Sequence, residues 1–385
     1  MFSGSLIVDD LIMNASILRV NGHFFGRRVL VYTTEVCTSR CACSQFRPMK
    51  IYENYSLKTL NTLGVAINAR YFCKLSKLGG LKSVMQWRRE HADLPVLFLG
   101  GGSNILFLED YPGLVVQVLL AERKVLGDDG EYVYIRAGGG ENWHDFVRWT
   151  IAQGYSGLEN LSLIPGTVGA APMQNIGAYG VELKDHFYEL QALDWQTAEL
   201  KKFNREACQF GYRDSHFKSV APGRWLIAAV TFRLPLKPEW KIDYAGMRES
   251  LEGQVLNAER ISDAVMAIRR SKLPDPLELG NAGSFFKNPL LPEAQWRELK
   301  EKFSDMPGWP QTGGNIKTSA GWLIDQCGWK GKRDGDAGTY DKHALILVNH
   351  GDASGAELWQ FAQGIIDSVE ARFGVTLEAE PRIIA

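Results

Sequence analysis

The pattern of hydrophobic and polar positions predicts a chain of mixed helices and strands. Apolar residues recur at helical spacing from Leu81 and over 143–151, and further helices are expected over 259–270, 293–303, 318–327 and 356–373. Short apolar runs typical of buried strands occupy 95–99, 114–120, 132–136, 187–195, 225–234 and 344–349. Ser354 and Glu357 have the spacing of a capping box before the last helix. These elements predict an α+β or α/β fold without internal repeats.

One long segment, residues 155–180, matches neither period. It is rich in glycine and also carries many apolar residues. A loop of this length inside a compact domain is usually functional or disordered. Its apolar content argues against disorder, so we expect it to have a function.

Length and composition narrow the class of protein. The 385 residues indicate two or three domains, and 45% hydrophobic with 23% charged residues is typical of a soluble globular protein. Lys and Arg number 43 against 44 Asp and Glu, a balance that argues against a nucleic-acid-binding protein. No long uninterrupted apolar stretch is present, so no membrane span is predicted.

The first 48 residues differ from the rest of the chain. They contain short apolar pieces without sustained periodicity and lack the regions of a secretory signal. The sequence MKIYENYS from Met49 resembles a mature N-terminus. We interpret residues 1–48 as an upstream extension, with translation from Met49 as the favoured reading and a targeting or partner-binding arm as the alternative.

The six cysteines do not form a disulfide framework. Cys73, Cys208 and Cys327 are far apart in sequence, which suits reduced thiols in a cytoplasmic protein. The other three, Cys37, Cys41 and Cys43, match no familiar zinc spacing and lack a fourth ligand. We therefore predict no metal site.

Two glycine-rich motifs are candidates for ligand binding. Residues 100–104, GGGSN, follow a predicted strand, and adjacent glycines can turn backbone N–H groups toward phosphate oxygens. The motif lacks the Lys-Ser/Thr pair of a Walker A loop, and a structural turn is an equally good reading. Residues 164–180, IPGTVGAAPMQNIGAYG, offer a wall of small residues with Gln174 and Asn175 as polar groups. Cofactor binding is favoured over a tightly packed crossing loop when the two motifs are taken together.

Three further motifs carry polar groups that could act in catalysis. GYRDS places Arg213 between a tyrosine and an aspartate, as either a surface ion pair or a guanidinium that stabilises negative charge. NAGSFFKNP presents Ser284 without the frame of a nucleophile elbow, and a simple turn would also explain this serine. LEAEPR carries Glu378 and Glu380, which would share one face of a strand.

Taken in order, these motifs resemble one family closely. GGGSN, QNIGAYG, GYRDS, KLPDP, NAGSFFKNP, AGWLIDQCG and LEAEPR follow each other as in the UDP-N-acetylenolpyruvoylglucosamine reductases. The resemblance covers residues 55–385 and has no counterpart for residues 1–48. Seven motifs in one order are highly specific, although each alone is weak.

The resemblance implies an α+β fold of the vanillyl-alcohol-oxidase type, also called PCMH-type, for FAD binding. Residues 49–120 and 121–272 would form two FAD-binding subdomains, and 273–385 a substrate-binding domain whose last strand returns to the active site. The flavin loops would comprise Gly100, Gly101, Gly102, Ser103, Asn104, Ile164, Pro165, Gly166, Thr167, Gly169, Ala170, Gln174, Asn175, Gly177 and Ala178. Neither loop contains His or Cys, so we expect non-covalent FAD.

The resemblance also implies a reaction and roles for particular residues. NADPH would reduce the flavin, and UDP-N-acetylglucosamine enolpyruvate would then accept hydride at C3 and a proton at C2. Ser284 matches the proton donor, and Arg213 and Glu380 match the pair that stabilises the enolate. Substrate would be held by the following residues: Tyr179, Lys272, Asn288, Gln326 and Tyr244, of which Tyr244 matches the closing tyrosine of the larger subtype. The enzyme is expected to be a cytoplasmic monomer that binds neither nucleic acid nor membrane.

Two departures from the family pattern stand out. Ala245 and Gly246 follow Tyr244 where Tyr-Gly is usual, and Pro381 replaces a β-branched residue, so the last strand is expected to end or lie at an edge there. Two other functions compete with the reductase. An oxidase of the same fold would bind flavin but ignore the enolpyruvyl substrate, and a nucleotide-sugar-binding protein would bind no flavin.

Overall fold

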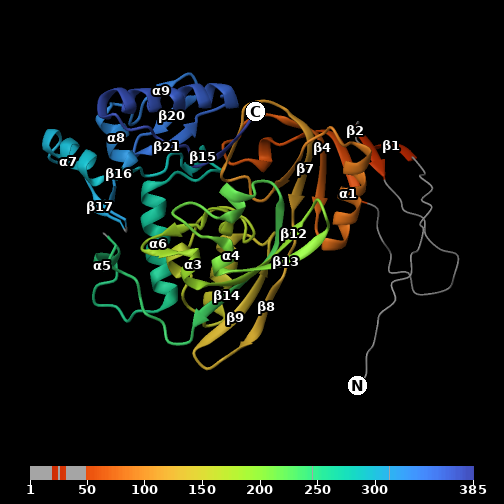
Figure 1. The fold of residues 1–385 in the computed structure, drawn as a ribbon, viewed down its shortest axis with the longest axis horizontal. Coiled ribbons are helices and arrows are strands. Elements are labelled where there is room, and N and C mark those ends of the chain that lie inside the picture. Colours follow the sequence, from red (N-terminus) through yellow and green to blue (C-terminus); the bar gives the residue numbers. More distant parts are fainter. Residues whose placement is uncertain (1–19, 25–26, 32–48, 245, 312) are drawn as a thin grey trace.

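The computed structural model describes residues 20–24, 27–31, 49–244, 246–311 and 313–385. Its larger sheets have six, five and four strands, and they are built from successive stretches of the chain (Figure 1). Helices and strands are mixed throughout, so the fold is α+β. No helix in the described ranges is long and apolar enough to cross a membrane.

The first sheet has the order β1-β2-β3-β4-β7-β5. Its strands are β1 (Val20–Phe24), β2 (Arg27–Val31), β3 (Lys50–Ser56), β4 (Asn68–Leu75), β7 (Tyr111–Val118) and β5 (Val96–Leu99). β4, β7 and β5 are parallel, whereas β1 to β4 pair antiparallel. Helix α1 (Leu81–Glu90) covers one face, because its buried Leu81, Val84 and Trp87 share a core with this sheet.

Part of the N-terminal extension extends this sheet. β1 and β2 form a hairpin, and β2 pairs with β3 from Val31 opposite Lys50 to Val29 opposite Tyr52. Cys37, Cys41 and Cys43 lie outside the described residues. The interpretation of residues 1–48 as an upstream extension therefore stays a prediction.

The second sheet is antiparallel throughout, with the order β13-β12-β14-β9-β8. Its strands are β8 (Arg123–Asp128), β9 (Tyr132–Gly138), β12 (Phe187–Asp194), β13 (Glu199–Asn204) and β14 (Trp225–Pro235). Helix α2 (Trp143–Ala152) begins at Asn142, whose side chain accepts a hydrogen bond from Asp145 N at 3.0 Å. Its buried Trp143 and Phe146 pack on Phe232 of the sheet.

The loop 155–180 packs against this second sheet. It contains the short helical turns Glu159–Leu161 and Ala171–Gln174 and the strand β10 (Gly177–Ala178), which pairs with β11 (Val181–Glu182). Leu158, Leu161, Val168 and Ala171 belong to the buried core of the second sheet. The segment is thus ordered by its apolar residues, as its composition indicated.

The third sheet has the order β15-β21-β20-β19 and follows helix α6 (Ala258–Lys272). Its strands are β15 (Gly280–Ser284), β19 (Arg333–Asp334), β20 (Ala337–Tyr340) and β21 (His343–Asn349), packed with α8 (Ala320–Gln326) and α9 (Gly355–Phe373). The predicted capping box of α9 is confirmed, because Ser354 Oγ accepts from Glu357 N at 3.2 Å and Glu357 accepts from Ser354 N at 2.8 Å. Beside it, β16 (Leu290–Pro292), β18 (Asn315–Lys317) and β17 (Trp309–Pro310) form a small sheet next to α7 (Glu293–Lys302).

The end of the chain returns to the part of the molecule that holds the first sheet (Figure 1). β22 (Arg382–Ile384) runs parallel to β6 (Ile105–Phe107), directly after the GGGSN motif. The expectation that Glu378 and Glu380 share one strand face is wrong. The segment before Pro381 makes one isolated bridge, Phe286 with Ala379, and the Glu378 side chain is 70% exposed against 12% for Glu380.

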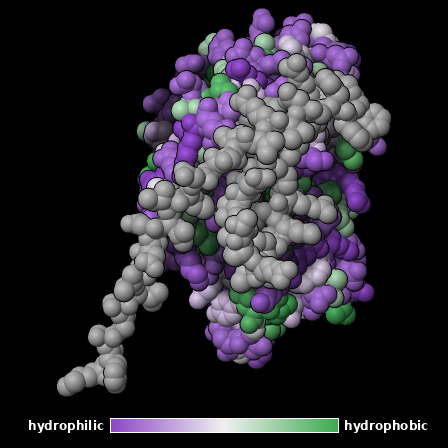
Figure 2. All heavy atoms as spheres, turned by 90° about the vertical axis from the view of Figure 1, so that its right-hand side faces the viewer, coloured by the Kyte–Doolittle hydropathy of each residue, from purple (hydrophilic) through white to green (hydrophobic). Residues whose placement is uncertain are grey.

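The surface is mainly polar in the view that Figure 2 gives. The atoms outside the grey region are mostly hydrophilic, with small separate hydrophobic spots. A mainly polar surface does not by itself indicate a functional site, whereas buried charged side chains in contact with each other do.

Candidate active site

The two glycine-rich loops lie against each other. A Cβ atom added to Gly101 would come within 2.9 Å of Gly166 Cα, and one added to Gly100 within 2.7 Å of Thr167 Oγ1. Gly102 has φ +63°, and a Cβ there would meet Leu60 O at 1.9 Å. The glycines are needed because the backbones of three segments approach closely at this point.

The residues present fit a phosphate-bearing cofactor. Among the described residues, the backbone N–H groups of Gly101, Gly102 and Ser103 donate no hydrogen bond to a protein acceptor. Gly101 is exposed, as are Pro165 and Ala170 of the second loop. Free N–H groups beside small exposed residues suit the pyrophosphate of a dinucleotide such as FAD.

Several residues around this loop adopt left-handed backbone conformations without being glycine. Leu163, Asn175, Tyr179 and Arg213 have φ between 46° and 58°. Such conformations cost free energy and often mark functional sites. At Arg213 the cause is a tight turn in which Gly211 N donates to Asp214 O at 3.0 Å.

Arg213 and Glu380 form a half-buried ion pair. Arg213 Nε lies 3.2 Å from Glu380 Oε1, and the two side chains are 21% and 12% exposed. Arg213 Nη2 also donates to Gly177 O at 2.9 Å, which ties the pair to the long loop. The structure therefore brings together two of the three predicted catalytic residues.

Gln174 joins this ion pair to the first glycine-rich loop. Its Nε2 donates to Glu380 Oε1 at 3.0 Å, and its Oε1 accepts from Asn104 Nδ2 at 2.7 Å. Asn104 O in turn accepts from Arg382 N at 3.0 Å. Glu380 is thus held from both flavin-loop motifs at once.

Ser284 follows a bulge in β15. The register against β21 shifts between Asn281 and Ser284, and Gly283 has φ +69° at the shift. The next residue, Phe285, accepts a hydrogen bond from Glu380 N at 2.8 Å through its carbonyl oxygen. Ser284 is therefore one residue away from the backbone contact that fixes Glu380.

Burial and several cations act on Glu380. Burial raises the pKa of Glu380, while the charges of Arg213, Lys218 and Lys287 and the Gln174 hydrogen bond act in the opposite direction. Burial is the larger effect, so the net shift is upward. A carboxyl group tuned in this way is typical of catalytic sites.

Sequence reasoning gave no role to two of the cations near Arg213 and Glu380. Lys218 Nζ lies 3.4 Å from Gln174 Oε1, and burial first and Lys287 second lower the pKa of Lys218. Burial also lowers the pKa of Arg269, which is beside Tyr179 and close enough to Arg213 to feel its charge. Arg269 Nε is buried and has no partner within the described residues. The only sequence signal was their position beside the motifs GYRDS and KLPDP.

The predicted substrate residues fall into two groups. Tyr179 and Tyr244 contact each other, with ring centroids 4.9 Å apart, and Tyr244 is 49% exposed. Asn288 Oδ1 accepts from Ala320 N at 3.0 Å at the start of α8, and Gln326 ends that helix. Lys272 is exposed at the end of α6, near His343. No hydrogen bond joins Lys272 or Gln326 to Glu380 in the part of the chain that the structure describes.

The side chain of Asn175 makes hydrogen bonds to other parts of the protein. It is fully buried, and its Nδ2 donates to Glu182 Oε2 at 3.1 Å and to Gly211 O at 3.0 Å. Its Oδ1 accepts from Lys184 N at 3.0 Å. The side chain thereby connects the long loop to the turn that carries Arg213, and its contact with a cofactor stays a prediction.

A cavity of about 430 Å³ lies between the turn of Tyr212 and the third part of the chain, and neither Arg213 nor Glu380 lines it. Its lining includes Tyr212, Lys287, Asn288 and Glu378 but not Ser284. Lys287 forms an ion pair with Glu378 at its edge. Within the described ranges, no group of three or more His, Cys, Asp or Glu residues could hold a metal ion.

Family models define the class of this protein. An FAD-binding domain model matches residues 70–204, and the model for the C-terminal domain of UDP-N-acetylenolpyruvoylglucosamine reductase matches residues 275–384. The first match covers both glycine-rich loops and the second covers Ser284 and Glu380. The protein is an FAD-dependent oxidoreductase.

Individual relatives specify the family. The UDP-N-acetylenolpyruvoylglucosamine reductase of Pseudomonas putida is 50% identical over 334 residues, which is 86% of this chain and 98% of that protein. The reductase of Pseudomonas aeruginosa is 48% identical over 338 residues, 87% of this chain and 99% of that one. The crystal structure of the reductase from Thermus caldophilus matches with a TM-score of 0.62 at 25% identity, covering 88% of this chain and all of that one. The chain belongs to the UDP-N-acetylenolpyruvoylglucosamine reductase family.

Proposed function

We propose that this enzyme reduces UDP-N-acetylglucosamine enolpyruvate to UDP-N-acetylmuramate with NADPH, a step in the synthesis of peptidoglycan precursors. The observation that carries the proposal is the Arg213–Glu380 pair, 3.2 Å apart and fixed next to the strand of Ser284. The pair supplies an anion-binding guanidinium and a carboxyl group with a raised pKa, and Ser284 is one residue before the Phe285 carbonyl that Glu380 N contacts. The names of the relatives support the same substrate.

FAD is held by the two glycine-rich loops in this proposal. The free N–H groups of Gly101, Gly102 and Ser103 would bind the pyrophosphate, and the small residues of 164–170 would leave room for the cofactor. FAD, when bound, supplies hydride transfer from NADPH to C3 of the enolpyruvyl group. Non-covalent binding is favoured because neither glycine-rich loop contains a histidine or a cysteine.

Arg213 binds and polarises the substrate carboxylate. The charges of Arg213, Lys218 and Lys287 act on Glu380, and Arg269 lies close enough to Arg213 to feel its charge. An anionic group from the substrate binds beside these cations and pairs with the unpartnered Nε of Arg269. The charge that develops on the carboxylate during reduction is stabilised by the same cations.

Ser284 gives its proton to C2. A serine hydroxyl is a weak acid, but the enolate that forms at C2 is basic enough to take the proton. The bulge at Gly283 precedes Ser284, which pairs with Ile346 of β21, and Glu380 N contacts the carbonyl oxygen of the next residue, Phe285. Glu380 stabilises the enolate together with Arg213.

The uridine diphosphate is held at the edge of the part of the chain that contains the third sheet. Lys272, Asn288 and Gln326 bind the sugar and phosphates, and Tyr244 closes over the nucleotide against Tyr179. Tyr244 is 49% exposed although it contacts Tyr179, so part of its ring is available to a ligand. NADPH uses the same cleft and leaves before the second substrate binds.

One absorption experiment tests the proposal. The purified protein should show a flavin band that NADPH bleaches under anaerobic conditions and that UDP-N-acetylglucosamine enolpyruvate restores. A band that is restored by oxygen or another sugar but not by this substrate would favour an oxidase of the same fold. A colourless protein that FAD does not reconstitute would favour a nucleotide-sugar-binding protein.

A further inference from the structure

Lys218 lies at the end of a hydrogen-bonded chain that leads to Glu380. Its Nζ contacts Gln174 Oε1 at 3.4 Å, and Gln174 Nε2 donates to Glu380 Oε1 at 3.0 Å. Gln174 Oε1 also accepts from Asn104 at 2.7 Å, so this oxygen has two donors and the amide orientation is fixed. The Gln174 N–H group can then point only toward Glu380.

The backbone that carries Lys218 is built to hold this position. Residues His216–Val220 form a π-helical turn, a rare element that is frequent at functional sites. Ser215 begins the turn, and its Oγ donates to Met173 O at 2.7 Å, directly before Gln174. Phe217 is buried in the core of the second sheet. The turn is thus tied to the loop of Gln174 on one side and to the core on the other.

We propose that Lys218 is a positioning residue that acts through Gln174 to orient Glu380 and, by its charge, to set the proton affinity of that carboxyl group. The inference rests on the proposed reductase function and deepens it. Lys218 takes part in no bond-making step. Its role is to fix which rotamer and which protonation state Glu380 offers to the substrate.

Other charged groups around Glu380 must be considered with Lys218. Five groups face Glu380 or Lys218. Tyr212, Arg213 and Asp214 lie on the GYRDS turn, Lys287 follows β15, and Glu378 lies on the segment that carries Glu380. Arg213 contacts Glu380 directly, and Lys287 is paired with Glu378. Lys218 is therefore the cation whose removal changes the charge at Glu380 without removing a direct partner.

The first test titrates Glu380 in the holoenzyme by infrared spectroscopy. The protonated-carboxyl band is assigned by its loss in Glu380→Gln, and its pH midpoint is compared in wild type and in Lys218→Met. Removal of a cation disfavours the carboxylate, so the midpoint should move upward in Lys218→Met and return in Lys218→Arg. Lys202→Met is the matched control, since Lys202 lies on the exposed edge strand β13 and pairs with Glu189 of β12. An unchanged midpoint in Lys218→Met would overturn the proposal.

The second test follows flavin reoxidation by the enolpyruvyl substrate. Lys218→Met should slow this half-reaction by about 10- to 100-fold, the effect of losing a hydrogen bond to a charged group. The apparent pKa of its pH profile should move upward in step with the infrared midpoint. If Lys218 acts through Gln174, Lys218→Met should slow the reaction less in a Gln174→Leu background than in wild type, whereas an equal loss in both backgrounds contradicts the relay.

The two readouts separate this inference from the proposed function. If wild-type flavin is not reoxidised by the substrate, the reductase proposal fails while the infrared titration still decides the role of Lys218. If Lys218→Met does not fold, Lys218→Gln takes its place, because it also removes the charge. A normal reaction with no midpoint shift in either variant refutes the positioning role alone.

Discussion

The backbone before Ser284 contains a bulge centred on one neighbouring residue. Gly283 at φ +69° breaks the register of β15, and Asn281 Oδ1 accepts from Gly283 N at 3.0 Å to hold the bulge. A regular strand would alternate Ser284 and Phe285 across the sheet without such a turn. The bulge thus sets the register at which Ser284 pairs with Ile346.

Removal of that hydroxyl should separate the two half-reactions. In Ser284→Ala, NADPH should still bleach the flavin, while reoxidation by the enolpyruvyl substrate should fall by about 10²- to 10⁴-fold, the usual range for lost general acid catalysis. Stopped-flow absorbance measures both steps. Ser271→Ala, at an exposed position of α6, is the control and should leave both rates unchanged. Equal rates in Ser284→Ala and wild type would remove Ser284 as the acid.

Glu380 should also make stability depend on pH. Its ordinary pKa is 4.5, and burial raises the pKa in the folded protein, so the folded state binds the proton more tightly. The contribution of this group to stability therefore falls as pH rises above about 4.5. Since glutamine cannot ionise, the difference in free energy of unfolding, Glu380→Gln minus wild type, should increase between about pH 4.5 and pH 8.

Urea unfolding across this pH range measures that difference. Glu378→Gln is the matched control, because its side chain is 70% exposed although it is only two residues away. The control should give a difference that stays level. A Glu380→Gln difference that decreases with pH would show that the cations, and not burial, dominate the site.

Residue identity was predictable from the motifs, but residue surroundings were not. Ser284, Arg213 and Glu380 could be selected only because seven motifs follow one family order. Nothing in the sequence indicated that Gln174 connects Asn104 to Glu380, since these residues are 70 and 206 positions apart. Lys218 was missed for the same reason, because its partner is 44 positions away.

At the scale of elements, hydrophobic periodicity predicted the buried ones. The structure confirms helices at 81–90, 143–152, 258–272 and 355–373 and strands at 96–99, 225–235 and 343–349. The edge strands β8 and β13 were missed, because all six residues of β8 and five of six in β13 are exposed. An edge strand without an apolar face gives no periodic signal.

The close approach of the flavin loop to Leu60 leads to a prediction about Gly102. A Cβ at Gly102 would lie 1.9 Å from Leu60 O, whereas Gly64 has a similar φ of +69° and open space around it. Gly64→Ala should therefore cost only backbone strain, about 1–2 kcal/mol. Gly102→Ala should in addition displace the loop and weaken FAD binding at least about tenfold, or 1.4 kcal/mol. Flavin fluorescence titration and thermal unfolding of both variants decide this, and equal FAD affinities would contradict a close-packed loop.

The arrangement of the whole molecule depends on a junction between the parts of the chain that hold the first and the third sheet. The turn 61–63 lies between them, with Thr62 N donating to Gly102 O at 3.0 Å and Asn281 N donating to Thr62 O at 2.9 Å. One residue thus connects the flavin loop to the start of the strand that carries Ser284. Sequence patterns could not predict this contact, because it joins residues more than 200 positions apart through backbone groups.

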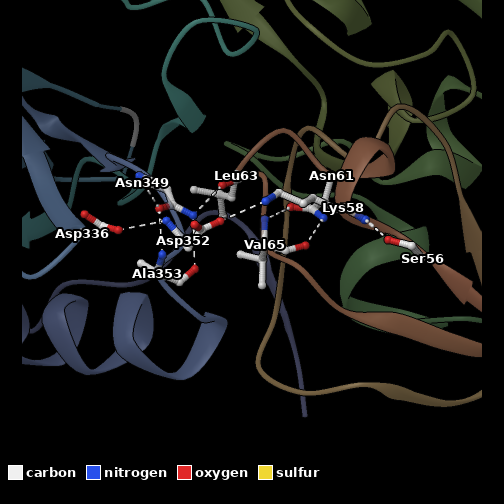
Figure 3. A network of polar contacts seen from close by, with 10 residues as sticks. Ser56, Lys58, Asn61, Leu63, Val65, Asp336, Asn349, Asp352 and Ala353 are labelled. Carbon is white, nitrogen blue, oxygen red and sulfur yellow. Dashed lines mark hydrogen bonds and ion pairs between the residues drawn. The ribbon is translucent and has the colours of Figure 1, made fainter.

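Asn349 fixes the junction from the side of the third layer (Figure 3). Its Nδ2 donates to Leu63 O at 3.0 Å and to Ala353 O at 3.1 Å, and its Oδ1 accepts from the N–H groups of Gly351 and Ala353. The residue is only 4% exposed, so these partners have no access to replacement water. Nearby, Lys58 and Asp352 form an ion pair across the same junction, but their side chains are 48% and 85% exposed.

The two contacts should therefore contribute very differently to stability. Asn349→Ala leaves several buried backbone groups unpaired and should lower the free energy of unfolding by about 2–4 kcal/mol. Lys58→Ala removes a solvated ion pair and should cost about 0.5 kcal/mol or less. Urea unfolding gives both values, and flavin reoxidation measured well below the unfolding transition reports on the geometry between the flavin loop and Ser284. In Asn349→Ala this rate should fall although no residue that touches the substrate has changed. A variant that loses stability but reoxidises its flavin at the wild-type rate would show that the junction supports the fold without setting the distance across the active site.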